Sequence, residues 1–257
     1  MSKKIISFVL AVLILASLCI TAFADDSDVN SDAALQKNVG YRDDGLPDID
    51  PYKWPFMLAN SYNSIGLYNY AGVNISYLYS SGIDSRILDD AVAFIEATRQ
   101  AGYEVYVNRG HMSWEYYLCG HYQSLIEQKY GDAYHAALNE LPPGCDDHQT
   151  SISFDICVDS RYQGDYASVD PSAKESEAFD YMSKHCAEYG FIVRYPEDKS
   201  DYYGVACPGA HFRYVGVEAA TYIMENNLCL EEFLLLYGYP VNLGTAVKDG
   251  AGEKDNY

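Results

Sequence analysis

The chain has 257 residues, a formal net charge of −20 and 49% hydrophobic residues. So acidic a composition excludes the broad basic surfaces that bind nucleic-acid phosphates, and we expect no nucleic-acid partner. The length and the apolar content are sufficient for one folded domain with a sizeable core.

The N-terminus has the pattern of a secretory signal peptide. Lys3 and Lys4 precede the apolar run 5–20, and Ala22 and Ala24 have the A-x-A spacing of a cleavage site. A retained membrane anchor is the alternative, but the apolar run is short for a spanning helix. We therefore expect a secreted, extracytoplasmic protein that has no membrane attachment once the signal is removed.

Charge and hydropathy divide the chain into four parts. After the signal peptide, 1–24, the segment 25–50 is acidic and has no apolar periodicity, which is typical of a disordered linker. The polar tail 241–257 has the same character. The segment between them, 51–240, is the predicted folded domain.

Helix and strand patterns alternate along this domain. In the segment 85–102, one helical face carries Ile87, Leu88, Ala91, Phe94 and Ile95, and Gly102 ends the pattern. The other elements that we predict are a strand at 103–107, a helix at 113–131, a strand at 151–158, a helix at 176–190, strands at 191–196 and 211–216, and helices at 217–227 and 230–238. Mixed elements joined by hairpins predict an α+β fold.

Six cysteines follow the signal peptide: Cys119, Cys145, Cys157, Cys186, Cys207 and Cys229. An even number in an exported protein is consistent with disulfides, but six cysteines allow 15 pairings and the sequence does not choose among them. No C-x-x-C pair occurs, which disfavours a metal site made mainly of cysteines.

Chemically active side chains gather in two segments. In DDHQTSISFD, His148 leads into a strand and Asp155 follows seven residues later, and in AHFRYVG, His211 begins another strand. Two histidines and one carboxylate form a ligand set for Zn²⁺ that leaves a fourth position open, as catalytic zinc sites do. Hydrogen-bonded histidines without a metal are the alternative, and spacing alone does not decide between the two.

Three longer blocks carry a resemblance to a known family. PPGCDDHQTSISFDI, YGFIVRYPEDK and GVACPGAHFRYVG resemble, in the same order, the blocks PPG-x-S-x-HQTG-x-A-x-D, YGFI-x-RYP-x-x-K and EPWHFRYVG of the VanY-like D-alanyl-D-alanine carboxypeptidases. The resemblance implies a single compact α+β domain with a central antiparallel sheet flanked by helices. It also implies His148, Asp155 and His211 as Zn²⁺ ligands, and removal of the C-terminal D-alanine from peptidoglycan stem peptides at the cell wall.

Two positions that serve catalysis in this family differ in the chain. The family's general base is a glutamate three residues before the last histidine, and Pro208 stands there. The family's arginine, which stabilises charge on the substrate, aligns with Met112, and Arg109 would replace it only in a different local register. A general base contributes about 100- to 10,000-fold and a charge-stabilising donor about 100- to 1,000-fold, so the chain needs replacements to be active.

The candidate replacements for the base are Asp146, Asp147, Glu197, Asp198 and Glu218. Two functions therefore remain open: a zinc D-alanyl-D-alanine carboxypeptidase, or a catalytically inactive relative that binds a cell-wall peptide or a protein partner. Cys207 as a thiolate would fill the open position on the zinc, or it would pair with Cys157. In a third hypothesis the zinc is lost and disulfides hold the domain together.

Overall fold

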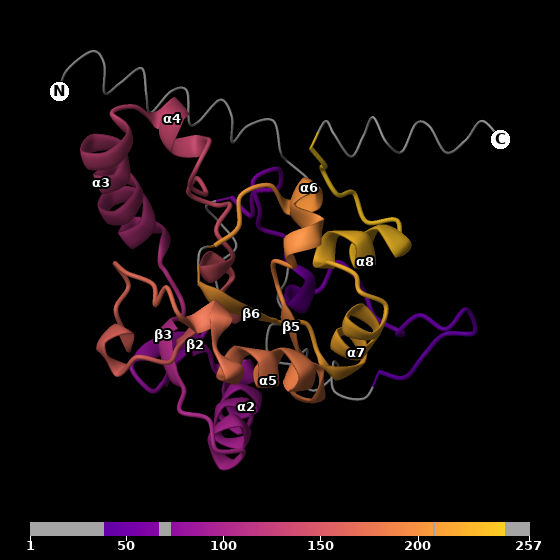
Figure 1. Ribbon diagram of the computed structural model, residues 1–257. Helices are drawn as coiled ribbons and strands as arrows, with labels where there is room; N and C mark the ends of the chain where they lie inside the picture. The colour runs from indigo at the N-terminus through magenta and orange to yellow at the C-terminus, as the bar shows by residue number, and fades with distance from the viewer. Residues whose placement is uncertain (1–38, 67–72, 208, 245–257) are drawn as a thin grey trace. The chain divides into compact units, whose positions relative to one another are not determined.

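The computed structural model describes residues 39–66, 73–207 and 209–244, all within one compact unit. The predicted signal peptide, Pro208 and residues 245–257 lie outside the described residues. The central sheet is antiparallel, with the strand order β3 (Tyr106–Arg109), β4 (Ser153–Cys157), β6 (Ala210–Tyr214) and β5 (Phe191–Val193) (Figure 1). A separate hairpin pairs β1 (Ile75–Leu78) with β2 (Ser81–Asp84). These antiparallel sheets, together with the helices around them, confirm the predicted α+β class.

The helices expected at 85–102, 113–131, 176–190, 217–227 and 230–238 are present, and the short helices Ala133–Ala137 and Ser200–Tyr203 were not predicted. The segment 113–131 is largely π-helical, at Tyr116–Tyr122 and Ile126–Tyr130. The α-helices are α2 (Leu88–Gln100), α3 (Gln123–Leu125), α4 (Ala133–Ala137), α5 (Glu177–His185), α6 (Ser200–Tyr203), α7 (Val217–Glu225) and α8 (Leu230–Leu236). Asp84 caps the turn before α2 by accepting a hydrogen bond from the backbone of Arg86, and Gly190, with φ of +78°, ends the helical segment that begins with α5. Among the described residues, no helix is long and apolar enough to cross a bilayer.

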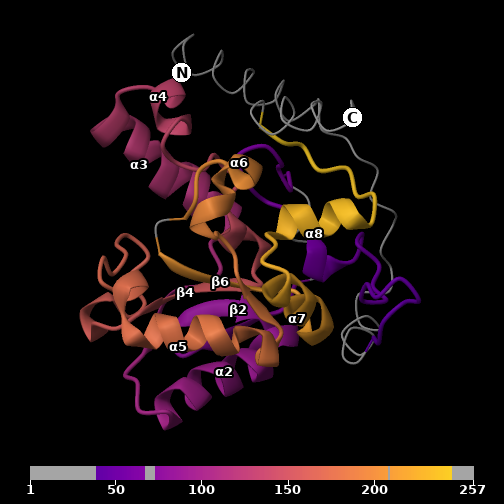
Figure 2. The same ribbon diagram turned by 45° about the vertical axis from the view of Figure 1, so that its right-hand side comes forward.

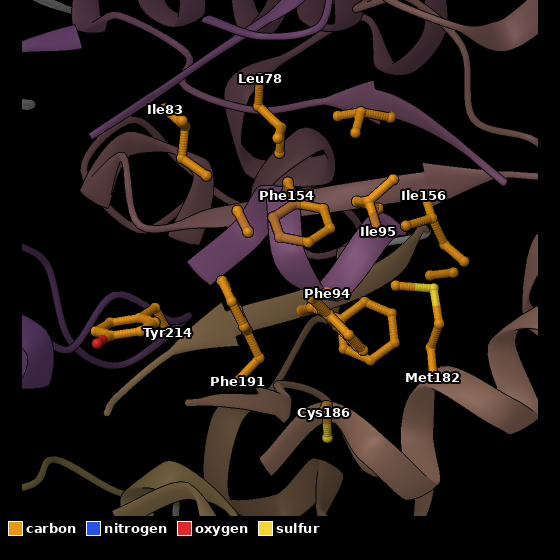
Figure 3. Close-up of a cluster of buried hydrophobic side chains, with 14 of the residues drawn as sticks. Leu78, Ile83, Phe94, Ile95, Phe154, Ile156, Met182, Cys186, Phe191 and Tyr214 are labelled. Atoms are coloured by element: carbon orange, nitrogen blue, oxygen red, sulfur yellow. The ribbon is translucent and has the colours of Figure 1, made fainter. Parts of the chain in front are cut away.

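The main hydrophobic core lies between one face of the sheet and the helices α2 and α5 (Figure 2). Phe94 of α2 stacks against Phe191 and meets Phe212 edge-on, with ring centroids 5.6 and 5.2 Å apart, and Met182 of α5 closes the cluster (Figure 3). Strand side chains alternate between the two faces of a sheet, so the polar residues next to Phe212 and Phe154 point away from this core. The functional candidates lie on that second face.

Helices α7 and α8 form a second core on the polar face of the sheet with Phe56, Ile192 and Val215. The segments expected to be linker and tail make contacts where they are described. The Tyr237 hydroxyl donates a hydrogen bond to the Pro47 carbonyl over 2.6 Å, and the backbone N–H of Asn242 donates to Asn63 over 2.9 Å.

Candidate metal centre

Three neighbouring strands bring together residues that are far apart in the sequence. In the sheet register Arg109 lies opposite Asp155, and Asp155 lies opposite His211. Asp155 Oδ1 is 2.7 Å from His211 Nδ1, and Asp155 Oδ2 accepts hydrogen bonds from Nε and Nη2 of Arg109 over 2.9 and 2.5 Å. All three side chains are buried. The predicted ligands Asp155 and His211 are therefore in direct contact.

A β-bulge places Arg109 at this site. The register between β3 and β4 shifts between Val107 and Arg109. Val107 belongs to the hydrophobic core, and in an unbroken strand Arg109 would share its face. The bulge inserts one residue and turns Arg109 to the opposite side. Met112, which aligns with the family's arginine, instead lies in an apolar cluster with Tyr122 and Ala136.

A tight turn holds His148. The 3-10 turn Asp147–Thr150 is capped by Asp146, whose Oδ1 accepts a hydrogen bond from the backbone N–H of His148 over 2.8 Å. Ser151 ends the turn with φ of +66°, a left-handed conformation that favours the glycine found there in the family blocks. This geometry places His148 Nε2 3.2 Å from Asp155 Oδ2 and the His148 ring 4.6 Å from the ring of His211.

The residues present fit a zinc ion. His148 is completely buried, and within the part of the chain that the structure describes neither of its ring nitrogens makes a well-formed hydrogen bond, although Nε2 lies 3.2 Å from Asp155 Oδ2. A buried imidazole without a well-formed hydrogen bond is costly, and a coordinated cation relieves that cost by taking the lone pair of one nitrogen. One ligand atom from each of His148, Cys207 and His211 lies within 4.8 Å of the other two. Imidazole, carboxylate and thiolate are the donors that zinc takes in proteins.

A second carboxylate orients His211 from its other side. Asp147 Oδ2 is 3.0 Å from His211 Nε2, and Asp147 Oδ1 accepts a hydrogen bond from Arg213. Burial opposes ionisation, but the charge of Arg213 and the contact with His211 hold the pKa of Asp147 below its usual range. Burial likewise disfavours the charged imidazole, but the hydrogen bonds to Asp147 and Asp155 outweigh it and raise the pKa of His211. Asp147 is thus bound to its partners and not free to act as a base. From the sequence it was considered only as a base.

The other base candidates lie in different places. Asp146 lines a cavity of about 180 Å³ together with Arg109 and Cys207, and Glu197 lines a cavity of about 170 Å³ next to His211. Asp198 accepts a hydrogen bond from the exposed side chain of Asn227. Glu218 acts electrostatically on Tyr214, whose ring packs in the core on the opposite face of the sheet from His211. Asp146 and Glu197 therefore line cavities at the site. Pro208, at the family's base position, lies outside the described residues.

Cys207 is buried beside the ligands. Its sulfur is 3.6 Å from the Tyr195 hydroxyl and 3.7 Å from Asp146 Oδ1, and burial raises the pKa of its thiol. Cys207 and Cys157 are both free thiols, so the expected alternative pairing between them does not form. Cys186 and Cys229 are free as well, which removes these four cysteines from the disulfide hypothesis.

Comparison with known proteins identifies the family of the chain. The family model described as "VanY: D-alanyl-D-alanine carboxypeptidase" matches residues 80–217, which is more than half of the chain and includes all the predicted ligands. The chain belongs to the VanY family. A D-alanyl-D-alanine carboxypeptidase of Enterococcus faecalis (strain ATCC 700802 / V583) is 37% identical over 92 residues, covering 36% of this chain and 31% of the relative. The bifunctional D-Ala-D-Ala dipeptidase and carboxypeptidase VanXYC of Enterococcus gallinarum is 35% identical over 91 residues, covering 35% of this chain and 47% of the relative. These alignments span about a third to a half of the curated relatives.

Solved structures extend the similarity over most of the domain. A mutant of the vancomycin-resistance D,D-pentapeptidase VanY from the VanB-type cassette, solved in complex with Zn(II), has a TM-score of 0.56 and 28% identity, covering 71% of this chain and 99% of that chain. VanYB in complex with D-alanine-D-alanine has the same TM-score and identity and covers 71% and 98%. The alignments therefore include nearly the whole length of both solved VanY-type structures.

Proposed function

We propose that this VanY-family chain is an exported zinc protein that binds the C-terminal D-alanine end of peptidoglycan stem peptides and hydrolyses it poorly. One observation carries the proposal: His148, Asp155 and His211 converge, whereas the carboxylate nearest to His211 Nε2, Asp147, is held by Arg213. The ligand set thus persists without a base at the family's position, where the sequence has Pro208.

The relatives support both the metal and the peptide. His148, Asp155 and His211 would hold Zn²⁺, as the structural neighbour solved with Zn(II) suggests by analogy. Bound zinc supplies positive charge and Lewis acidity to the site. The neighbour VanYB was solved with D-alanine-D-alanine, and the cavity beside the site here has two basic side chains, Arg109 and Lys129, and two acidic ones, Asp146 and Glu140, in its wall. Arg109 and Lys129 are paired with Asp155 and Glu140, so the terminal carboxylate of a peptide would share these cations with the acids.

Export follows from the signal-peptide pattern at 1–24 and suits this ligand, because peptidoglycan peptides lie outside the cytoplasmic membrane. We therefore place the protein at the cell wall. Binding of a protein partner through the same cavity is the other form of an inactive relative, and the D-alanine-D-alanine bound by the neighbour VanYB favours the cell-wall peptide.

Active hydrolysis is the second candidate function, and the position of Asp146 favours it. Asp146 shares the cavity wall with Arg109, next to the predicted ligands. A carboxylate there has access to a bound peptide, although its Oδ1 already accepts the backbone hydrogen bond of His148. Asp146→Asn distinguishes this role, since it keeps the shape of the side chain and removes the basic oxygen.

The test combines binding with turnover. Zinc-loaded protein is titrated calorimetrically with a stem pentapeptide ending in D-Ala-D-Ala, and D-alanine release is followed in parallel. We expect saturable binding, with release far below the usual enzyme range of about 1 to 1,000 per second. Release in that range, lost in Asp146→Asn and in His211→Ala, would establish the second candidate. An absence of binding would overturn the peptide-binding function.

A further inference from the structure

Cys207 lies where a fourth metal ligand would be needed. Its side chain is 2% exposed, and its sulfur belongs to the group in which the ligand atoms of His148, Cys207 and His211 are all within 4.8 Å of one another. Two ligands on one tetrahedral zinc are about 3.5 Å apart, given bonds of about 2.0 to 2.3 Å. Small side-chain adjustments therefore bring all three atoms into bonding range.

Gly209, two residues after Cys207, packs closely against the predicted ligand Asp155. A Cβ built on Gly209 would lie 2.3 Å from Asp155 Oδ2, so any side chain at this position would collide with that carboxylate. Glycine lets the backbone at Gly209 approach Asp155 this closely. Two residues earlier, the Cys207 sulfur makes long contacts of 3.6 Å to the Tyr195 hydroxyl and 3.7 Å to Asp146 Oδ1.

The buried histidine supplies an independent observation. Neither ring nitrogen of His148 makes a well-formed hydrogen bond inside the described structure, although the residue is fully buried and Nε2 lies 3.2 Å from Asp155 Oδ2. A thiol, a carboxylate and a second imidazole surround it. Such a set of donors around a buried imidazole is the arrangement of a site closed by protein ligands.

We propose that Cys207 is a zinc ligand, which together with His148, Asp155 and His211 makes a closed site of four protein ligands. When the ion binds, the thiol releases its proton to solvent and the sulfur forms a bond to zinc. This inference rests on the zinc binding of the proposed function. Four protein ligands leave no position for a catalytic water, so the ion stabilises the fold, and peptide recognition is left to the walls of the adjacent cavity.

X-ray absorption at the zinc edge tests this ligand set directly. The zinc-loaded wild type is compared with Cys207→Ser and with the control Cys186→Ser, which removes a buried thiol from the opposite face of the sheet. We expect one zinc–sulfur distance of about 2.3 Å in the wild type and the control, and none in Cys207→Ser. The zinc affinity of Cys207→Ser should fall at least about 10-fold, the lower limit for losing a supporting group at a metal site.

Each outcome separates this inference from the proposed function. A wild type that binds one zinc with only nitrogen and oxygen neighbours overturns the role of Cys207 and leaves zinc binding intact. A wild type that binds no zinc overturns both. If Cys207→Ser does not fold, the wild-type spectrum still decides, and the thiolate-to-metal absorption of the cobalt-substituted wild type provides a second readout.

Discussion

Glu231 offers a direct test of the buried charge network that supports the site. Its two carboxylate oxygens pair with Nη1 and Nη2 of Arg194 over 3.0 and 2.7 Å, and Asn60 donates a further hydrogen bond over 2.7 Å. The side chains of Glu231 and Arg194 are fully buried. Glu231→Gln keeps the shape and removes the charge. Arg194 then keeps its hydrogen bond to the Ala59 carbonyl over 3.2 Å and the carboxylate of Asp147, 3.6 Å from its Nε.

The expected loss follows from this geometry. Removing one partner of a buried ion pair costs about 3 to 5 kcal/mol, and we expect about 3 kcal/mol here because Asp147 still compensates part of the charge. For a domain of this size each kcal/mol corresponds to about 2 to 4 °C, so the melting temperature should fall by about 6 to 12 °C. Urea unfolding followed by circular dichroism, together with calorimetry, measures both quantities.

Two further variants make the test specific. Glu225→Gln, an exposed glutamate at the end of α7, should change the free energy of unfolding by less than about 0.5 kcal/mol. The double variant Glu231→Leu with Arg194→Met should recover most of the loss, because an apolar replacement of a whole buried pair is often neutral or stabilising. If Glu231→Gln unfolds within about 1 kcal/mol of the wild type with an unchanged urea slope, the reasoning from an uncompensated buried charge is wrong.

Three other predictions concern the loops and the missing base. Gly209→Ala should weaken zinc binding and destabilise the fold by about 1 to 3 kcal/mol through overpacking, because its Cβ would lie 2.3 Å from a carboxylate oxygen of the aspartate ligand. Gly120→Ala, which meets nothing within 4 Å, is the control, and equal melting temperatures for the two variants would contradict the clash. Asp170 accepts four hydrogen bonds from neighbouring backbone and hydroxyl groups. Burial disfavours the ionised carboxylate, but the hydrogen bonds outweigh this effect and lower the pKa of Asp170. The contribution of Asp170 to stability is therefore present above the ordinary aspartate pKa and is lost as the pH falls through the lowered value. Asp170→Asn should therefore be destabilised by about 1 to 2 kcal/mol near neutral pH and approach the wild type in acid, and a difference that does not depend on pH would refute this. Pro208→Glu in a Cys207→Ala background should release D-alanine at least about 10-fold faster than Cys207→Ala alone, since a general base contributes about 100- to 10,000-fold. Unchanged release would show that the base is not the missing element.

The elements with strong apolar periodicity were predictable from the sequence. The helix at 85–102 buries Ile87, Ala91, Phe94 and Ile95 as expected, because a repeat near 3.6 residues indicates which side of a helix is buried. Leu88, expected on the same face, is only partly buried against the core. The hairpin β1–β2 was not predicted, since β2 is buried at all four positions and shows no alternation. The strand expected at 103–107 is displaced to Tyr106–Arg109, where the bulge interrupts the period of two.

The sequence by itself determined the family, the α+β class and the three candidate ligands, because consecutive motif residues carry that information locally. Only the tertiary structure decided that Arg109 faces Asp155, and that Asp147 is bound by Arg213 rather than free to act as a base. Tertiary structure also placed Cys207 beside the two histidines. These relations depend on strand register, on one inserted residue and on contacts between segments far apart in the chain. The periodicity of apolar residues along a single helix or strand does not reveal strand register, a bulge or such long-range contacts.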